Sequence, residues 1–385
     1  MSDNDYIVFG KPLLGEAEIE AVVSAMRSGW VGTGPRVHEF EGRFAKYIGC
    51  KHAVAMGSCT AALHVAMETW GLREGDEVIT TPLTFAATAN AVVHAGATPV
   101  FADIDPSTWN LDPARVEDCI THRTRALLPV HMYGRPADMD GLRTLANRYG
   151  LLIIEDAAHA IEAKYHGQKV GALGDASCFS FYTTKNLTTV EGGMLCTNQD
   201  AVASKARILA LHGLSADAWA RFSDKGYRHY DVVFSGYKYN MTDMQASIGL
   251  CQLDQVQTWL RRRETIWNRY DEAFADLPIQ LPPTPEPDTV HARHLYTILV
   301  DETIAGISRD AFLLGMHEAR IGTGVHYRAL HTQPFYRRRF GYKRDDFPHA
   351  ARVGDQTVSL PLTAGLTDAE VSRVIDRVRE LLGKR

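Results

Sequence analysis

Three short polar segments of the chain carry residue types that can do chemistry, and each follows an apolar run. Asp156 lies just beyond the apolar residues 151–154, and Lys185 follows a second such run. The third segment, Gly57-Ser-Cys-Thr-Ala, joins the strand-like residues 53–56 to a helical pattern. Continuously apolar runs are typical of strands in a parallel sheet, where ligands bind beyond the carboxyl ends of the strands. The three segments are therefore candidates for one ligand site.

These segments offer complementary chemistry. We expect Lys185, which lies between an apolar run and the Gly192-Gly193 turn, to point inward; apolar surroundings lower the pKa of a lysine, and the neutral amine can form a Schiff base. Asp156 could keep a ring nitrogen protonated, and small hydroxyl residues before a helix could hold a phosphate at the positive end of the helix dipole. Together these are the requirements of pyridoxal phosphate. Taken singly, Asp156 could instead cap a helix and Lys185 could be a solvated charge.

Motifs of several other chemistries are absent from the sequence. There is no G-x-G-x-x-G after a strand, no G-x-x-x-x-G-K-[ST], no G-x-S-x-G and no H-E-x-x-H. The six cysteines include no C-x-x-C pair, which favours reduced thiols over a disulfide framework or a zinc site. We therefore expect no metal.

Charge and hydropathy exclude further classes of protein. Lysine and arginine number 41 against 46 aspartate and glutamate, and the net charge of −5 gives no general attraction to nucleic acid or anionic membranes. No run approaches the roughly 18 apolar residues of a membrane span. The first residues also lack the pattern of a signal peptide. We expect a cytoplasmic protein with no nucleic-acid or membrane partner.

Alternating apolar and helical patterns predict an α/β fold. Strands are expected near residues 78–81, 99–102, 126–130, 151–154 and 194–196, and helices near 61–70, 138–149 and 200–211. A long helical pattern over 242–275 is followed by a proline-rich segment, which marks a boundary. We predict a large α/β domain over residues 1–275, with an N-terminal helical segment, and a small α+β domain over 276–385.

Sequence motifs along nearly the whole chain carry a family resemblance. They are Gly57-Ser-Cys-Thr-Ala-Ala, Thr81-Pro-Leu-Thr-Phe-Ala-Ala-Thr, Glu155-Asp-Ala-Ala-His-Ala, Ser180-Phe-Tyr-Thr-Thr-Lys-Asn, Glu191-Gly-Gly, Gly236-Tyr-Lys-Tyr-Asn-Met-Thr-Asp-Met-Gln-Ala and Ser359-Leu-Pro-Leu. In this order they resemble the DegT-type family of pyridoxal-phosphate-dependent nucleotide-sugar aminotransferases. The resemblance implies aminotransferase fold type I, with a mostly parallel sheet flanked by helices, and a homodimer with shared active sites.

The resemblance also implies roles for individual residues. Lys185 is the Schiff-base lysine and carries a proton between the substrate carbon and the cofactor, and Asp156 is the partner of the pyridinium nitrogen. Phe85 stacks on the cofactor ring, with an ordinary core residue as the alternative, and His159 lies near the ring oxygen. The remaining cofactor contacts are Thr60, Ala61 and Ser180 at the phosphate, with Asn240 and Lys238 reaching it from the partner subunit.

The chain departs from the family pattern at two places. Many relatives have Asn then Arg where this chain has Lys238 then Asn240. It is therefore open which of these two residues contacts the cofactor phosphate. Glu162 stands where relatives usually have glycine. If that position needs a special backbone angle the glutamate is costly, and otherwise it is a surface change.

Histidines and arginines of the C-terminal part are candidates for substrate binding. The resemblance places residues 326–331 near the sugar-nucleotide entrance, where cationic donors suit a diphosphate. From this group we select His326 and Arg328 as substrate-binding residues. The run Arg337–Arg339 fits a solvated basic face equally well.

The leading hypothesis is a ping-pong transaminase that moves an amino group from L-glutamate, released as 2-oxoglutarate, to a nucleotide-linked ketosugar. His159, where some C-3 enzymes have glutamine, and a likeness to arabinose-modifying members favour amination at C-4 over C-3. A sugar dehydratase of the same fold would have histidine in place of Lys185. A non-catalytic regulatory protein that binds pyridoxal phosphate would be expected to lack Lys185 or Asp156. The nucleotide, the sugar and the pathway (lipid A, O-antigen, capsule or antibiotic) stay open.

Overall fold

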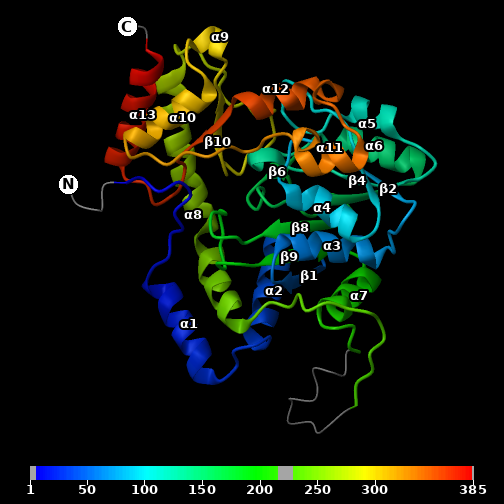
Figure 1. Cartoon of the computed structure of the whole chain (residues 1–385). Coiled ribbons are helices and arrows are strands. Elements are labelled where there is room, and N and C mark those ends of the chain that lie inside the picture. Colours follow the sequence, from blue (N-terminus) through cyan, green and yellow to red (C-terminus); the bar gives the residue numbers. More distant parts are fainter. Residues whose placement is uncertain (1–5, 216–228, 384–385) are drawn as a thin grey trace.

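A seven-stranded sheet forms the centre of the computed structural model, which describes residues 6–215 and 229–383 (Figure 1). The order of its strands is β1 (His52–Met56), β9 (Gly193–Thr197), β8 (Ala176–Ser180), β5 (Leu152–Asp156), β4 (Thr124–Leu128), β2 (Glu77–Thr80) and β3 (Thr98–Phe101). Only β9 runs against its two neighbours; the other pairs are parallel. The carboxyl ends of all strands except β9 therefore meet at one edge of the sheet.

Helices cover both faces of this sheet. One face packs on α2 (Pro35–Ile48), α6 (Met139–Tyr149) and the first half of α8 (Asp243–Phe274), and the other on α3 (Cys59–Thr69), α4 (Ala86–His94) and α7 (Asp200–Ala210). Alternate strand residues enter opposite cores: Ala53 and Ala55 the first, Val54 and Met56 the second. Burial on both faces explains why these strands are apolar throughout rather than alternating.

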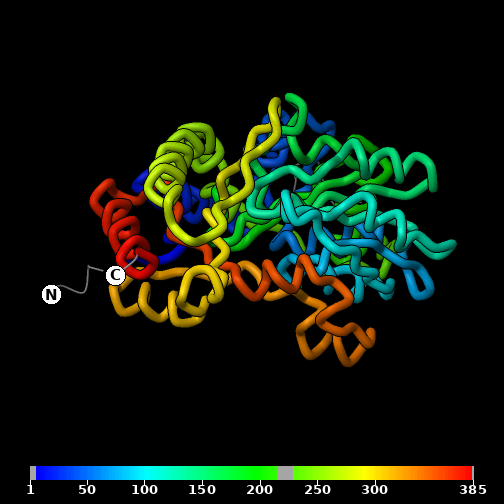
Figure 2. The backbone as a smooth tube through the Cα atoms, turned by 90° about the horizontal axis from the view of Figure 1, so that it is seen from above, coloured from blue at the N-terminus to red at the C-terminus, as the bar shows by residue number. Residues whose placement is uncertain are grey.

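The C-terminal part of the chain has a core of its own. The second half of α8 packs there against the antiparallel pair β10 (Tyr296–Leu299) and β11 (Thr357–Leu360), and against α10 (Arg309–Glu318) and α13 (Asp368–Leu382). Figure 2 shows α8 and α13 on the same side of the molecule. The remaining elements are α1 (Glu16–Ser28), α5 (Pro113–Cys119), α9 (Glu302–Ala305), α11 (Pro334–Phe340), α12 (Pro348–Gln356) and the hairpin of β6 (Lys164–Tyr165) and β7 (Gln168–Lys169).

The expected strands and helices all occur, with one difference of direction. The apolar pattern predicts a strand over residues 194–196 like the others, but β9 is antiparallel to both neighbours. An apolar run records burial on both faces and carries no information about direction. The domain boundary at residue 275 stays a prediction. Among residues 6–215 and 229–383, no helix is both long and apolar enough to span a membrane, and no group of three metal-ligating side chains occurs.

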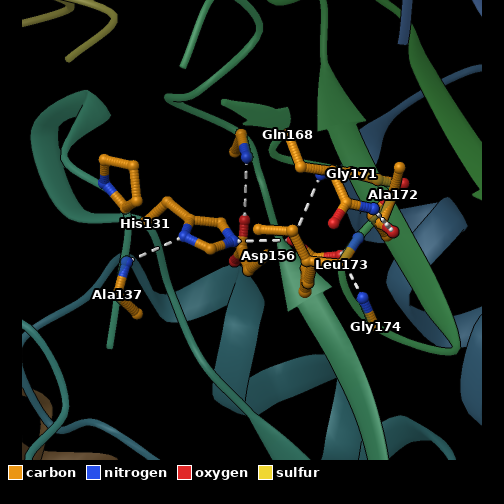
Figure 3. Close-up of polar contacts among 12 residues, drawn as sticks. His131, Ala137, Asp156, Gln168, Gly171, Ala172, Leu173 and Gly174 are labelled. Carbon is orange, nitrogen blue, oxygen red and sulfur yellow. Dashed lines mark hydrogen bonds and ion pairs between the residues drawn. The ribbon is translucent and has the colours of Figure 1, made fainter. Parts of the chain in front are cut away.

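Glu155, the residue before Asp156, holds the carboxyl end of β5 in place through its hydrogen bonds. The fully buried Glu155 carboxylate accepts hydrogen bonds from the N–H groups of Leu173 (3.0 Å) and Gly174 (2.7 Å) through Oε1, and from Gly171 (3.1 Å) and His131 Nε2 (3.0 Å) through Oε2. Figure 3 shows His131 held on its other side by Ala137 N–H, which donates to Nδ1 at 3.0 Å. Because Glu155 and Asp156 are successive strand residues, their side chains lie on opposite faces.

Removing this carboxylate should destabilise the protein. We expect Glu155→Ala to lower the free energy of unfolding by at least about 3 kcal/mol, because several buried donors lose their acceptor at about 1–3 kcal/mol each. Urea unfolding of the apoprotein measures the loss. Glu117→Ala, which removes a carboxylate that is 43% exposed and pairs with Arg148, should cost less than about 1 kcal/mol. Equal effects of the two variants would contradict this reading.

Candidate active site

A cavity of about 550 Å³ opens at the carboxyl edge of the sheet. Its lining comes from the ends of several strands: Ser58 and Thr60 follow β1, Asp156 ends β5, and Ser180 ends β8. Lys185 enters from the loop between β8 and β9. The structure thus brings the three polar segments singled out in the sequence into one cavity.

Lys185 is held in this cavity by a tight turn. Its N–H donates to the Tyr182 carbonyl at 2.9 Å, and the neighbouring Phe181 and Leu187 are buried in the core. Burial lowers the pKa of Lys185 to about 8, although Cys59 and Asp156 act in the opposite direction. A substantial fraction of its amine is therefore neutral and nucleophilic near neutral pH.

Asp156 is a buried carboxylate with defined partners. Its side chain accepts a hydrogen bond from Thr88 Oγ1 at 2.7 Å and another from the N–H of Ala158 at 3.1 Å. Thr84 lies behind Thr88, with its hydroxyl oxygen 2.7 Å from that of Thr88. Burial raises the pKa of Asp156, and the bond from Thr88 opposes the shift. A cationic partner inside the cavity would stabilise the carboxylate form.

His159 is a neutral imidazole at the cavity wall. Burial, assisted by Lys185 and His326, lowers its pKa well below the ordinary value. Its Nε2 lies 3.1 Å from the Tyr327 hydroxyl, while its buried Nδ1 has no hydrogen-bond partner in the described chain. The ring lies 4.4 Å from that of His294. An orphaned buried nitrogen beside a cavity is free to meet a ligand.

Phe85 is not a core residue, so the alternative interpretation of this side chain does not hold. It is 59% exposed at the N-cap of α4 and lines the cavity with its ring 5.6 Å from that of Tyr327. An apolar ring left exposed at a cavity wall can stack on a planar ligand.

The expected phosphate contacts are only partly placed at the cavity. Thr60 and Ser180 line it, whereas Ala61 does not: its N–H donates to the capping Ser58 Oγ at 3.1 Å. The backbones of Ser58 and Gly193 approach closely here, since a Cβ on Gly193 would lie 2.3 Å from the carbonyl carbon of Ser58. The first turn of α3 still presents N–H groups that the helix itself cannot use.

Lys238 and Asn240 lie outside the cavity of their own chain. Lys238 Nζ donates to Asn240 Oδ1 at 2.6 Å, and Asn240 Nδ2 donates to Thr33 Oγ1 at 2.7 Å. The segment is fixed to the end of β1, because Gly57 N–H donates to the Tyr239 carbonyl at 2.7 Å.

The tail residues divide between two cavities and the surface. His326 lines the main cavity, stacks on Phe9 at 5.3 Å, and has its pKa lowered to about 4 by burial. Arg328 lines a second cavity of about 690 Å³, which shares Thr84, Phe85 and Tyr327 with the first. His331 is fully buried with its Nε2 at the Arg344 carbonyl, and residues 337–339 are exposed on α11.

Glu162 fits neither expectation stated for it. Its φ lies outside the left-handed region, and its side chain is 1% exposed, so it is neither strained there nor a surface change. The carboxylate forms a buried ion pair with Arg263 of α8. Sequence reasoning also missed Thr88, Phe9 and His294; only the four-residue spacing of Thr84 and Thr88 could have indicated a shared face.

Comparison with known proteins decides between the chemistries open to this site. The model of the DegT/DnrJ/EryC1/StrS aminotransferase family matches residues 12–379. The chain belongs to this family. Its fold is aminotransferase fold type I, and its cofactor is pyridoxal phosphate.

Individual family members cover almost the whole chain. The spore coat polysaccharide biosynthesis protein SpsC of Bacillus subtilis (strain 168) is 47% identical over 380 residues, 98% of each chain. Spr1654 from Streptococcus pneumoniae, solved in PMP and PLP forms, has a TM-score of 0.90; the PMP form is 34% identical over 97% of this chain and 98% of its own. PseC of Helicobacter pylori, an aminotransferase involved in the biosynthesis of pseudoaminic acid, has a TM-score of 0.90 and is 27% identical over 98% and 99% of the two chains.

The cavity of this family member fits pyridoxal phosphate. Lys185 offers a neutral amine, Asp156 a buried carboxylate, and His159 a ring nitrogen that has no partner among the described residues. Thr60 and Ser180 offer hydroxyls at the first turn of α3 and the end of β8. When bound, the cofactor supplies an electron sink for bonds at the amino-bearing carbon.

The lowered pKa of Lys185 has a direct kinetic consequence. We expect the rate at which pyridoxal phosphate combines with the apoprotein to rise with pH around a midpoint near 8, where Lys185 becomes neutral. At pH 7 about one amine in ten is neutral, against fewer than about one in a thousand for an ordinary lysine. Stopped-flow absorbance between pH 6.5 and 10.5 measures the profile. A midpoint above 10 would contradict the assignment of this environment to Lys185.

Proposed function

We propose that the protein transfers an amino group from L-glutamate to the C-4 keto carbon of a nucleotide-linked ketosugar. Glutamate leaves its nitrogen on the enzyme and departs as 2-oxoglutarate, after which the ketosugar binds and takes the nitrogen. The observation that carries the proposal is the convergence of Lys185, Asp156 and His159 in one cavity. Each residue has a distinct task in such a transfer.

Lys185 is the proposed proton carrier. Its neutral amine can take a proton from the amino-bearing carbon of glutamate and return one to the carbon of the sugar. Asp156 keeps the ring nitrogen of the cofactor cationic through a charged hydrogen bond, and Thr88 orients the carboxylate. Phe85 and His159 hold the ring, and Tyr327 helps to close the cavity against water.

The second cavity supports a substrate longer than a free sugar. It borders the main cavity at Phe85 and Tyr327, which line both, and has a volume of about 690 Å³. Arg328 is exposed at its wall, where it could meet a phosphate. His326, neutral and inside the main cavity, is placed to donate or accept a hydrogen bond with a sugar hydroxyl.

We propose a homodimer in which Lys238 and Asn240 reach the cofactor phosphate of the partner subunit. Both residues lie away from their own cavity. The segment before them exposes three apolar side chains, Val232 (70%), Val233 (49%) and Phe234 (43%). Exposed apolar patches of this kind are typical of subunit interfaces.

The test is a screen of acceptors with enzyme first treated with L-glutamate and freed of 2-oxoglutarate. UDP-, GDP- and dTDP-linked 4-ketosugars are compared with a 3-ketosugar and with a free ketosugar, and the position of the new amino group is read by NMR. The proposal expects a nucleotide-linked 4-amino product. An amino group at C-3 would contradict the proposed position, and equal use of the free sugar would contradict the nucleotide linkage. A protein that releases no 2-oxoglutarate when treated with L-glutamate would favour a regulatory protein.

A further inference from the structure

Glu162 and Arg263 form a buried ion pair that ends beside the catalytic lysine. The Glu162 side chain is fully buried and that of Arg263 is 3% exposed. Arg263 also donates through Nε to the Arg293 carbonyl at 3.1 Å and through Nη2 to the Ala292 carbonyl at 3.3 Å. The pair thus ties α8 to the segment that leads into β10.

Asn186 connects the ion pair to the residue next to it in the chain, Lys185. Its Nδ2 donates to Glu162 Oε2 at 2.8 Å and to the Ala292 carbonyl at 2.9 Å. With both amide hydrogens used, its Oδ1 accepts from His294 Nδ1 at 3.0 Å. The tautomer and orientation of His294 are therefore set by Asn186.

His294 in turn contacts His159, a residue of the cavity wall. The His294 ring lies 4.4 Å from the His159 ring, and His159 Nε2 lies 3.1 Å from the Tyr327 hydroxyl. His294 itself lines a small cavity together with Lys185 and His326. Burial lowers the pKa of His294 well below its ordinary value, so both neighbouring rings are neutral.

We propose that Glu162 and Arg263 are positioning residues, which act through Asn186 and His294 to hold Lys185 and His159 in the geometry the reaction needs. This inference rests on the proposed catalytic role of Lys185. Stability alone is a weak reason for such a pair, because well-packed apolar replacements of buried ion pairs are often neutral or stabilising. An apolar replacement that keeps the stability of the protein but lowers its activity would therefore indicate a positioning role rather than a structural one.

The test replaces both partners at once, as Glu162→Leu with Arg263→Met. We expect this double variant to unfold within a few degrees of the parent, since no unpaired charge remains. The Ala292 carbonyl keeps its bond from Asn186, and among the described residues only the Arg293 carbonyl and one Asn186 amide hydrogen lose a partner. Its kcat with L-glutamate should fall about 10- to 100-fold with little change in KM, because the change displaces a catalytic group and leaves the residues that bind the substrate in place. The visible circular dichroism per bound cofactor reports the orientation of the cofactor independently of turnover, and it should differ from that of the parent.

A control outside this network uses Glu77 and Arg123, whose side chain is 56% exposed, at the opposite edge of the sheet. Their side chains pair at 2.6 Å, and Glu77 is 6% exposed at the start of β2. Glu77→Leu with Arg123→Met should leave the dichroism and kcat at parental values.

Each outcome decides the inference. A stable Glu162/Arg263 double variant with parental dichroism and kcat would overturn it, while a parent that fails to react with L-glutamate would overturn the proposed function instead. If the double variant does not fold, Asn186→Leu is tested instead. This substitution leaves the ion pair intact but removes the hydrogen bonds of Asn186 to Glu162 and His294, and it should produce the same fall in kcat and the same change in dichroism. Parental behaviour of Asn186→Leu would overturn the inference as well.

Discussion

Lys185→Ala is expected to reduce turnover by a factor of at least about 10⁴, the upper range for a single acid–base group, because the residue is the proposed attachment point and proton carrier. The fold should survive, since the amine lines a cavity and its loop is held by Phe181 and Leu187 in the core. Steady-state assays and thermal unfolding of the same preparation measure the two properties.

Lys169 provides a matched control for this prediction. Its pKa is also lowered to about 8 by burial, yet its Nζ lies over the Tyr47 ring and donates to the Tyr47 hydroxyl at 2.7 Å, outside the cavity. Borohydride reduction of the loaded enzyme should fix the cofactor to the peptide of Lys185 and leave that of Lys169 unmodified. Label on Lys169, or full activity in Lys185→Ala, would refute the assignment.

Asp156→Asn is expected to lower kcat/KM about 100- to 1000-fold. The neutral amide keeps the size of the side chain but cannot perform the role proposed for Asp156, which is to keep the ring nitrogen of the cofactor cationic. Loss of one such buried electrostatic contact typically costs about 2.7–4 kcal/mol in the transition state. Kinetics of the glutamate half-reaction measure the effect.

The same variant should leave the apoprotein as stable as the parent, or more stable. Burial raises the pKa of Asp156, so its charged form is disfavoured in the folded chain above the ordinary carboxyl pKa. Removing the charge therefore relieves a cost. A large drop in apoprotein stability together with parental kinetics would show that Asp156 is a structural residue.

The strand ends that build the site can be predicted from the sequence because buried strands are continuous runs of apolar residues. The apolar character of residues 151–154 predicts a strand, and Asp156 is indeed the last residue of β5. The place of Lys185 between an apolar run and a Gly-Gly turn predicts that it points inward, and it lines the cavity. These inferences need only local pattern and the rule that ligands meet the carboxyl edge.

Contacts between distant residues cannot be predicted in this way. His294 and Phe9 reach the site from distant parts of the chain, and no local spacing connects them with Lys185. The partner of Glu162 lies about a hundred positions away on α8, which is why local pattern suggests a strained backbone or a surface change rather than a buried ion pair. The direction of β9 likewise depends on tertiary packing.

The absorption spectrum of the protein loaded with pyridoxal phosphate, recorded before and after addition of L-glutamate, tests the central claim most directly. We expect the visible band of the lysine-bound cofactor to disappear, the band of pyridoxamine phosphate to grow, and one 2-oxoglutarate to be released per cofactor. A visible band that L-glutamate leaves unchanged would contradict the claim that this cavity performs the amino-donor half of a transamination.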